Sequence, residues 1–159
     1  MTETLNTIGD IIRENAVNQK FVGSIVHTSG VVQQSILFNL LYTMVGGETQ
    51  LLSLRISILY FLQCYLYKNE SEKSKIIQKL FYQTENAANK HTLGHLLTTG
   101  ILSKDIVSSW CSFIALSHLI ADSQESKETI LLVKLPVDQT PTGAKTLMEI
   151  SFDLLTNVI

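Results

Sequence analysis

Apolar residues recur at helical spacing along most of the chain, and no window alternates apolar and polar residues over a sustained length. A repeat near 3.6 residues places apolar side chains on one face of a helix, whereas a strand needs a repeat of two. We therefore expect an all-α protein. The predicted helices span residues 3–20, 31–45, 50–68, 70–83, 93–100, 104–121, 125–135 and about 143–158, with polar linkers at 84–91 and 137–142.

The segment 54–69 differs from the others because it is apolar nearly all the way round, yet it carries Arg55 and Gln63. A helix that is apolar on every side must be covered on every side, so it belongs inside a stack of helices. A membrane span would have to bury Arg55, which hydrocarbon penalises by a few kcal/mol. A core helix is the better interpretation. Arg55 is then expected to pair with an acidic neighbour, or to reach a helix end while its stem packs, with partner binding as the alternative.

For two further helices, the sequence also predicts the environment of individual residues. In the helix over 104–121, Trp110 is expected to be a buried packing anchor whose indole N–H seeks a carbonyl. The helix over 70–83 is expected to carry a solvated charged face formed by Glu70, Glu72, Lys73 and Lys75.

Local signals also mark helix ends. Asn69 is expected to cap the helix that follows it, with Glu72 completing a capping-box pair. The Gly46-Gly47 pair is expected to supply the positive φ that ends a helix at little cost.

The spacing of the longer helices indicates how they are organised. They begin near residues 3, 50, 104 and 143. Intervals of roughly 40 to 50 residues are typical of armadillo and HEAT repeats, although loops of unequal length make the period irregular here. We therefore predict an armadillo/HEAT-like α-solenoid of about three to four helical repeats, in which each repeat buries its faces against its neighbours.

Composition narrows the possible functions. Hydrophobic residues make up 45% of the chain and charged residues 16%, which is little charge for a free-standing helical domain. This fits a segment whose ends neighbouring repeats cover. The net charge of −2, without a basic run, does not favour nucleic-acid binding. Cys64 and Cys111 lie in apolar helices without metal-site spacing, which points to a reducing compartment. No secretory signal is visible at the start of the sequence.

The spacing of the candidate catalytic and metal-binding residues in the sequence does not match that of known catalytic or metal sites. His91 and His95 could share a helix face, as zinc ligands do, but no third ligand is near in sequence. Cys111 and His118 lie two helical turns apart, about 10 Å along the axis, which is too far for a nucleophile–base pair. Gly46-Gly47 lacks the Lys and Ser or Thr of a phosphate-binding loop. We expect no enzyme, no cofactor and no metal site, and the sequence assigns no partner-binding residue.

Two continuous segments of the sequence resemble a known protein family. The segment 54–69 and the block 109–118 resemble, in the right order, the armadillo-like head of the general vesicular transport factors, the Uso-type golgins that tether vesicles. Residues 2–8, 17–21 and 94–105 are also similar to that head, with looser matching at 24–31 and 71–90. The resemblance therefore runs almost from end to end. Residues 1–159 are expected to form one segment of a larger armadillo-like head, without the coiled-coil tail.

The resemblance implies a non-catalytic interaction scaffold in a vesicle-tethering factor of ER-to-Golgi and intra-Golgi transport. It implies a cytoplasmic protein peripherally associated with Golgi and transport-vesicle membranes, with Rab-type GTPases and tethering complexes as partners. Its parent would be a homodimer through the tail. Two alternatives stay open: an armadillo-type adaptor for nuclear import or the cytoskeleton, and a small helical hydrolase using Cys111. The adaptor would usually show a ladder of Asn and Trp, and Trp110 is the only Trp in the chain.

Overall fold

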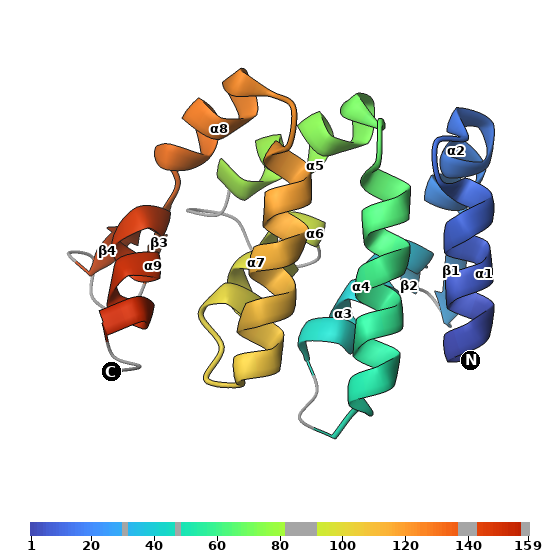
Figure 1. Cartoon of the computed structure of the whole chain (residues 1–159), viewed down its shortest axis with the longest axis horizontal. Coiled ribbons are helices and arrows are strands. Elements are labelled where there is room, and N and C mark those ends of the chain that lie inside the picture. Colours follow the sequence, from blue (N-terminus) through green and yellow to red (C-terminus); the bar gives the residue numbers. More distant parts are fainter. Residues whose placement is uncertain (30–31, 47–48, 82–91, 137–142, 157–159) are drawn as a thin grey trace. The chain divides into compact units, whose positions relative to one another are not determined.

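The computed structural model describes residues 1–29, 32–46, 49–81, 92–136 and 143–156. Helices dominate these residues, which confirms the predicted all-α class (Figure 1). The helices are α1 (Thr2–Ile12), α2 (Ala16–Ser24), α3 (Ile36–Val45), α4 (Leu52–Leu66), α5 (Glu70–Phe81), α6 (Leu93–Ile101), α7 (Ile106–Ile120), α8 (Gln124–Leu131) and α9 (Leu147–Thr156). Four short strands accompany them: β1 (Val26–Ser29), β2 (Val32–Ser35), β3 (Lys134–Pro136) and β4 (Ala144–Thr146).

A repeat of three helices organises the chain, and its clearest marker is a strained turn. Glu14, Lys68 and Asp122 have positive φ angles of 58°, 53° and 64°, which non-glycine residues adopt uncommonly. These three residues are spaced at intervals of 54 residues. Each lies between the first and second helix of a triplet, namely α1–α2, α4–α5 and α7–α8. Three helices per repeat make the period longer than the predicted 40 to 50 residues, and the arrangement agrees with an armadillo-like fold.

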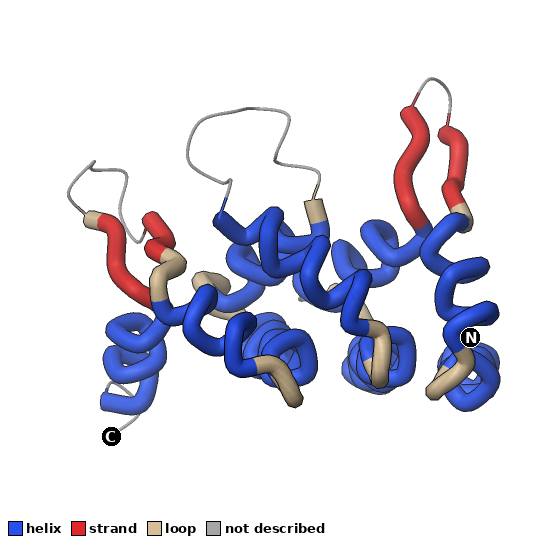
Figure 2. Tube along the Cα trace, turned by 90° about the horizontal axis from the view of Figure 1, so that it is seen from above, coloured by secondary structure: helices blue, strands red, loops and turns tan. Residues whose placement is uncertain are grey.

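The chain divides into two compact units, Met1–Leu119 and Ile120–Ile159. In the first unit, α1, α4 and α7 lie side by side, and they appear end-on in a row in Figure 2. Behind this row α3 packs against α4 and α6, and α5 packs against α6. In the second unit, α9 contacts α8 and the β3–β4 hairpin.

The core of the first unit is centred on α4, as the sequence predicts. Ile58 and Tyr65 are each 1% exposed and lie on this helix. The helix is not covered on every side, however, because Leu52 and Ile56 are 54% and 44% exposed. No helix in the described part of the chain is both long and apolar enough to cross a bilayer.

Four helix boundaries differ from the prediction. The last helix, expected from about residue 143, begins only at Leu147, because residues 144–146 form β4 and pair with β3. The helix expected over residues 3–20 is broken by the turn at Glu14 into α1 and α2. The helix expected from residue 31 begins only at Ile36, because residues 32–35 form β2 and pair with β1. The helix expected over 125–135 ends at Leu131, and β3 follows. Strands of three or four residues are too short for a period of two to be recognised, and they are stabilised by a partner strand elsewhere in the chain.

The local capping predictions also fail in detail. Asn69 directly precedes α5, but its side-chain amide donates to the carbonyl of Tyr65 and so closes the end of α4. Glu72 accepts a hydrogen bond from Lys75 at 2.5 Å instead of completing a capping box. Gly46 ends α3 with a φ of −90°, so it does not use the left-handed region, and Gly47 lies outside the described residues.

Candidate protein-binding surface

Arg55 is buried where three helices meet and is held by three hydrogen bonds, one of which is also an ion pair. It is 3% exposed. Its Nε donates to the carbonyl of Met44, near the end of α3, at 2.8 Å. One terminal nitrogen donates to Asp105 Oδ2 at 2.7 Å and to Ser108 Oγ at 2.6 Å, at the start of α7. Both alternatives that the sequence left for this charge are therefore confirmed: it pairs with an acid and it reaches a helix end. Arg55 is a structural residue.

The acidic partner, Asp105, has a lowered pKa that favours its ionised form. The Ser108 hydroxyl and the Arg55 guanidinium hydrogen-bond to Asp105 and, against the effect of burial, lower its pKa to about 2. The backbone N–H of Ser108 also donates to Asp105 Oδ2, at 3.1 Å. Ser108 Oγ lies 2.7 Å from both this carboxylate and the carbonyl of Val45, so it also connects α7 to the end of α3. The network fixes the first turns of α4 and α7 relative to each other.

Four large apolar side chains lie exposed on the same two helices, beside this buried network. Leu52 and Ile56 of α4 are 54% and 44% exposed, and Ile106 and Trp110 of α7 are 82% and 49% exposed. Each pair has i, i+4 spacing and therefore shares one helix face. The 54-residue repeat relates Leu52 to Ile106 and Ile56 to Trp110, so both pairs occupy the same places in successive repeats. We refer to these four residues as the α4–α7 apolar surface.

The exposure of Trp110 corrects the sequence prediction, which placed this residue in the core. The buried face of α7 is instead made largely of small residues: Ser108, Cys111, Ser112 and Ala115, together with Leu116 and Leu119. Small side chains let this helix approach α6 closely. A Cβ on Gly100 of α6 would lie 2.0 Å from Ser112 Oγ. The sequence prediction assigned the largest apolar residues to the core, and it therefore identified the wrong face of α7 as the buried one.

The predicted charged face of α5 is also only partly solvated. Lys75 is exposed, as expected, and it forms an ion pair with Glu72. The Lys73 side chain is only 4% exposed, and its Nζ donates to Glu70 at 2.8 Å. A lysine stem can pack along apolar surface while its ammonium finds an acceptor, which a charge pattern alone does not reveal.

The candidate nucleophile is poorly placed for chemistry. Cys111 is fully buried, and burial raises the pKa of its thiol. His118 is half-buried; burial and then the charge of Lys73 lower its pKa. A nucleophilic cysteine needs an accessible and partly ionised thiol, which this environment opposes. His95 lies in α6 and His91 lies outside the described residues. Within the described ranges, no group of three His, Cys, Asp or Glu side chains could hold a metal ion.

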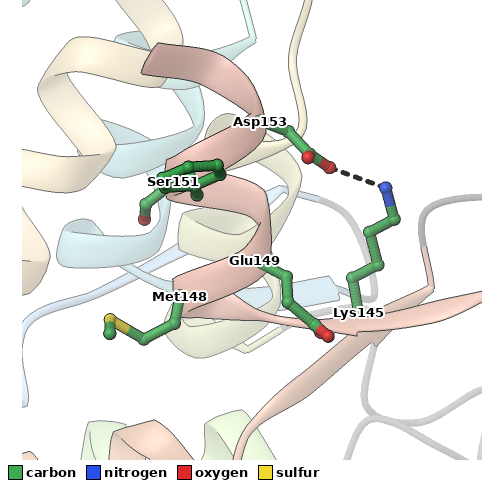
Figure 3. Close-up of a pocket in the computed structure, with 6 residues that line it drawn as sticks. Lys145, Met148, Glu149, Ser151 and Asp153 are labelled. Carbon is green, nitrogen blue, oxygen red and sulfur yellow. Dashed lines mark hydrogen bonds and ion pairs between the residues drawn. The ribbon is translucent and has the colours of Figure 1, made fainter. Parts of the chain in front are cut away.

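A pocket in the second unit is formed by β4 and α9 (Figure 3). Lys145 Nζ lies 2.6 Å from Asp153 Oδ2. The backbone N–H and the hydroxyl of Thr146 both donate to Glu149 and lower the pKa of its carboxyl group. Each charged side chain thus has a local partner. The exposed apolar residues here, Met148 and Phe152, again have i, i+4 spacing, which suits packing against protein better than acid–base chemistry.

Comparison with known proteins shows which family the chain is similar to. A family model described as "Uso1 / p115 like vesicle tethering protein, head region" matches residues 14–158. The chain is 38% identical over 136 residues to the general vesicular transport factor p115 of Homo sapiens, and equally to those of Rattus norvegicus and Bos taurus. Each alignment covers 85% of this chain but only 14% of the relative's length.

Proposed function

The chain belongs to the Uso1/p115-like family of vesicle tethering proteins, and on that premise we propose that it is a non-catalytic docking segment of a tether's head region. Residues 1–159 then form part of a larger armadillo-like head. The observation that carries the proposal is the α4–α7 apolar surface, since monomeric proteins usually expose large apolar side chains singly. Here two pairs are exposed at equivalent places of consecutive repeats.

The chemistry of this surface suits protein recognition. Trp is enriched among the residues that dominate binding energy, and it contributes most when neighbouring apolar residues exclude water around it. Ile106, one helical turn before Trp110 on the same face of α7, is a neighbour that can do so. Because Arg55 fixes α4 against α7 from beneath, the surface is ordered before a partner arrives, which reduces the entropic cost of binding.

A catalytic role has less support. The only thiol with a histidine on its helix, Cys111, is buried and kept protonated, and the charged groups of the α9 pocket have local partners. The relatives are named as transport factors. We therefore propose a protein that holds other proteins and turns over no substrate.

We propose that its partners are proteins of the trafficking machinery, either a Rab-type GTPase or subunits of a tethering complex. The parent protein would act at the cytoplasmic face of Golgi and transport-vesicle membranes, as a homodimer through a coiled-coil tail. Family membership supports this setting over nuclear import or cytoskeletal scaffolding, and the ladder of Asn and Trp expected of such adaptors is missing from the sequence.

The test is a binding assay with a longer head that includes residues 1–159. It is presented separately to GTP-loaded and GDP-loaded Rab proteins and to tethering-complex subunits. Replacing Ile56 and Trp110 by Ser should weaken the productive interaction about tenfold or more, as expected when a hot-spot side chain is removed. The matched control is Leu132→Ser, which changes an equally apolar and more exposed residue (75% exposed) outside the surface.

Equal binding by the double variant and the parent head would refute the α4–α7 apolar surface as the docking site. Selective binding to nuclear-import or cytoskeletal proteins, with no trafficking protein bound by either version, would refute the tether assignment itself.

A further inference from the structure

A second pocket lies in the first unit, between α2 and the beginning of α5. It has a volume of about 590 Å³. Its wall on the α2 side includes Lys20 and Gly23, and its wall on the α5 side includes Ser71, Glu72 and Lys75. It shares no residue with the α4–α7 apolar surface.

Tyr65 reaches this pocket from α4 and supplies an unsatisfied hydroxyl. The residue is 1% exposed, and its oxygen has no hydrogen-bond partner among the described residues. Buried tyrosine hydroxyls usually find a partner, so an exception requires an explanation. Burial raises the pKa of Tyr65, as do the negative charge of Glu72 and the approach of its carboxylate to the hydroxyl, so the hydroxyl stays protonated. That approach does not reach hydrogen-bond geometry, so the hydroxyl is available as a donor.

Gly23 explains how the hydroxyl reaches the wall formed by α2. A Cβ at this position would lie 2.5 Å from the Tyr65 oxygen, which is closer than real contacts allow. Only a residue without a side chain therefore leaves room for the phenol here. The hydroxyl therefore lies against the backbone of α2, in a wall that Ala16, Lys20 and Ser24 also line.

The charges around the pocket favour an anion. Lys20 is exposed and does not occur among the ion pairs of the described residues. Lys75 pairs with Glu72 at 2.5 Å, but an ammonium has three hydrogens and can serve a second acceptor. The first turn of α5, a helix of 12 residues, adds the positive end of its dipole. With two lysines and one glutamate, the side chains lining the pocket carry a net charge of +1.

We propose that this pocket binds a side-chain carboxylate from an acidic segment of a protein partner. A single negative charge balances the lining, whereas a phosphate dianion would exceed it and would be repelled more strongly by Glu72 than a carboxylate is. Lys20 and Lys75 attract the carboxylate, and the Tyr65 hydroxyl is the buried donor that orients it. The site stands independently of the proposed docking through the α4–α7 apolar surface.

The proposal can be tested with synthetic probes on the full chain. Fluorescence anisotropy would follow a labelled hexaglutamate peptide, with a hexaglutamine peptide as the uncharged match. Hexaglutamate should bind and hexaglutamine should not, and added salt should weaken the binding because exposed lysines contribute to it. Tyr65→Phe and Lys20→Gln should each weaken it about tenfold, the usual effect of losing a hydrogen bond or charge contact to an ion. Glu72→Gln should strengthen it, and Lys104→Gln, at an exposed lysine elsewhere, should leave it unchanged.

Several outcomes would overturn the proposal. Absence of hexaglutamate binding would do so, as would equal affinity of the Tyr65→Phe variant, provided circular dichroism shows that this variant is folded. Gly23→Ala offers an independent variant in which the peptide affinity should also fall. Tighter binding of inorganic phosphate, or of vesicles containing phosphoinositide, would assign the pocket to phosphate instead. Weaker binding by Glu72→Gln would show that Glu72 holds Tyr65 as part of the fold and that the pocket has no preference for anions.

Discussion

Glu14 and Lys68 occupy the same turn of two consecutive repeats, and their side chains form an ion pair with each other. Beside this pair, the Arg13 guanidinium lies 4.8 Å from the centroid of the Tyr67 ring, and Lys68 Nζ lies 5.6 Å from it. The turns that end α1 and α4 are therefore matched in sequence position, in backbone conformation and in direct contact. Exposed pairs of this kind add little stability, so their value here lies in marking the register of the repeats.

Arg55→Met should destabilise the chain by about 3–5 kcal/mol, because it breaks an ion pair whose arginine is buried and leaves Asp105 without its charged partner. The measurement is chemical denaturation followed by circular dichroism. Arg13→Met provides the control, since Arg13 is exposed and makes a cation–π contact only. A double variant, Arg55→Met with Asp105→Leu, should recover part of the loss, because both charges are then absent. Equal destabilisation by the single and double variants would contradict this account of the pair.

Asp105 should make the stability depend on acid pH. Its pKa is lowered from 3.8 to about 2 in the folded chain, so the unfolded chain binds the proton more readily. The stabilisation is therefore fully present above about pH 4 and is lost as the pH falls toward 2. Denaturation midpoints measured between pH 5 and pH 2.5 should fall steeply for the parent and less steeply for Asp105→Asn. Parallel curves for the two proteins would assign the acid sensitivity to other carboxylates.

Trp110→Ala should cost about 1 kcal/mol or less, because half of the side chain is already exposed to solvent. Leu119→Ala, at a fully buried position of the same helix, should cost about 2–5 kcal/mol. Thermal melts of the two variants give the comparison. If Trp110→Ala proved as costly as Leu119→Ala, the indole would have to be buried, as the sequence alone suggested.

Lys73→Glu and Lys75→Glu should differ sharply although the residues are two apart. Lys75 is 60% exposed, so its replacement should stay within about half a kcal/mol. Lys73 is 4% exposed, and a glutamate there would bury a carboxylate beside Glu70. That change should destabilise the chain by about 1–3 kcal/mol or more, the cost of an unsatisfied buried group. Similar melting temperatures for both variants would place Lys73 in solvent.

The sequence predicted the features that depend on long, continuous patterns. The all-α class follows from helical spacing along most of the chain. The central position of α4 and the kinds of partner that Arg55 has follow from a long apolar segment that contains a buried charge, although the sequence did not identify Asp105 or Met44. The features that failed depend on short elements or on a choice between faces. The β1–β2 hairpin is defined by pairing of Val26 with Ser35, which no local period can reveal. The buried face of α7 depends on close approach at Gly100 and Ser112, a matter of shape and not of hydrophobicity.

The candidate surfaces were harder to predict for the same reason. The sequence prediction placed Trp110 in the core, and the α4–α7 apolar surface, which includes Trp110, could therefore not be recognised. A signal was present, since Leu52 and Ile56 recur as Ile106 and Trp110 after 54 residues, but it becomes visible only when the turns at Glu14 and Lys68 give the period. The Tyr65 pocket had no sequence signal, because it depends on the space that Gly23 leaves.

The contacts of Arg55 have a consequence for how the chain unfolds. Repeat proteins commonly behave as one-dimensional arrays, in which each repeat interacts only with its immediate neighbours and can be lost stepwise from an end. Arg55 belongs to the second helical triplet, Met44 to the first, and Asp105 and Ser108 to the third. A single side chain therefore connects α3, α4 and α7 across three successive triplets. Fraying at either end of this region would have to break a hydrogen bond of this one side chain, which favours one concerted transition over a series of partial ones.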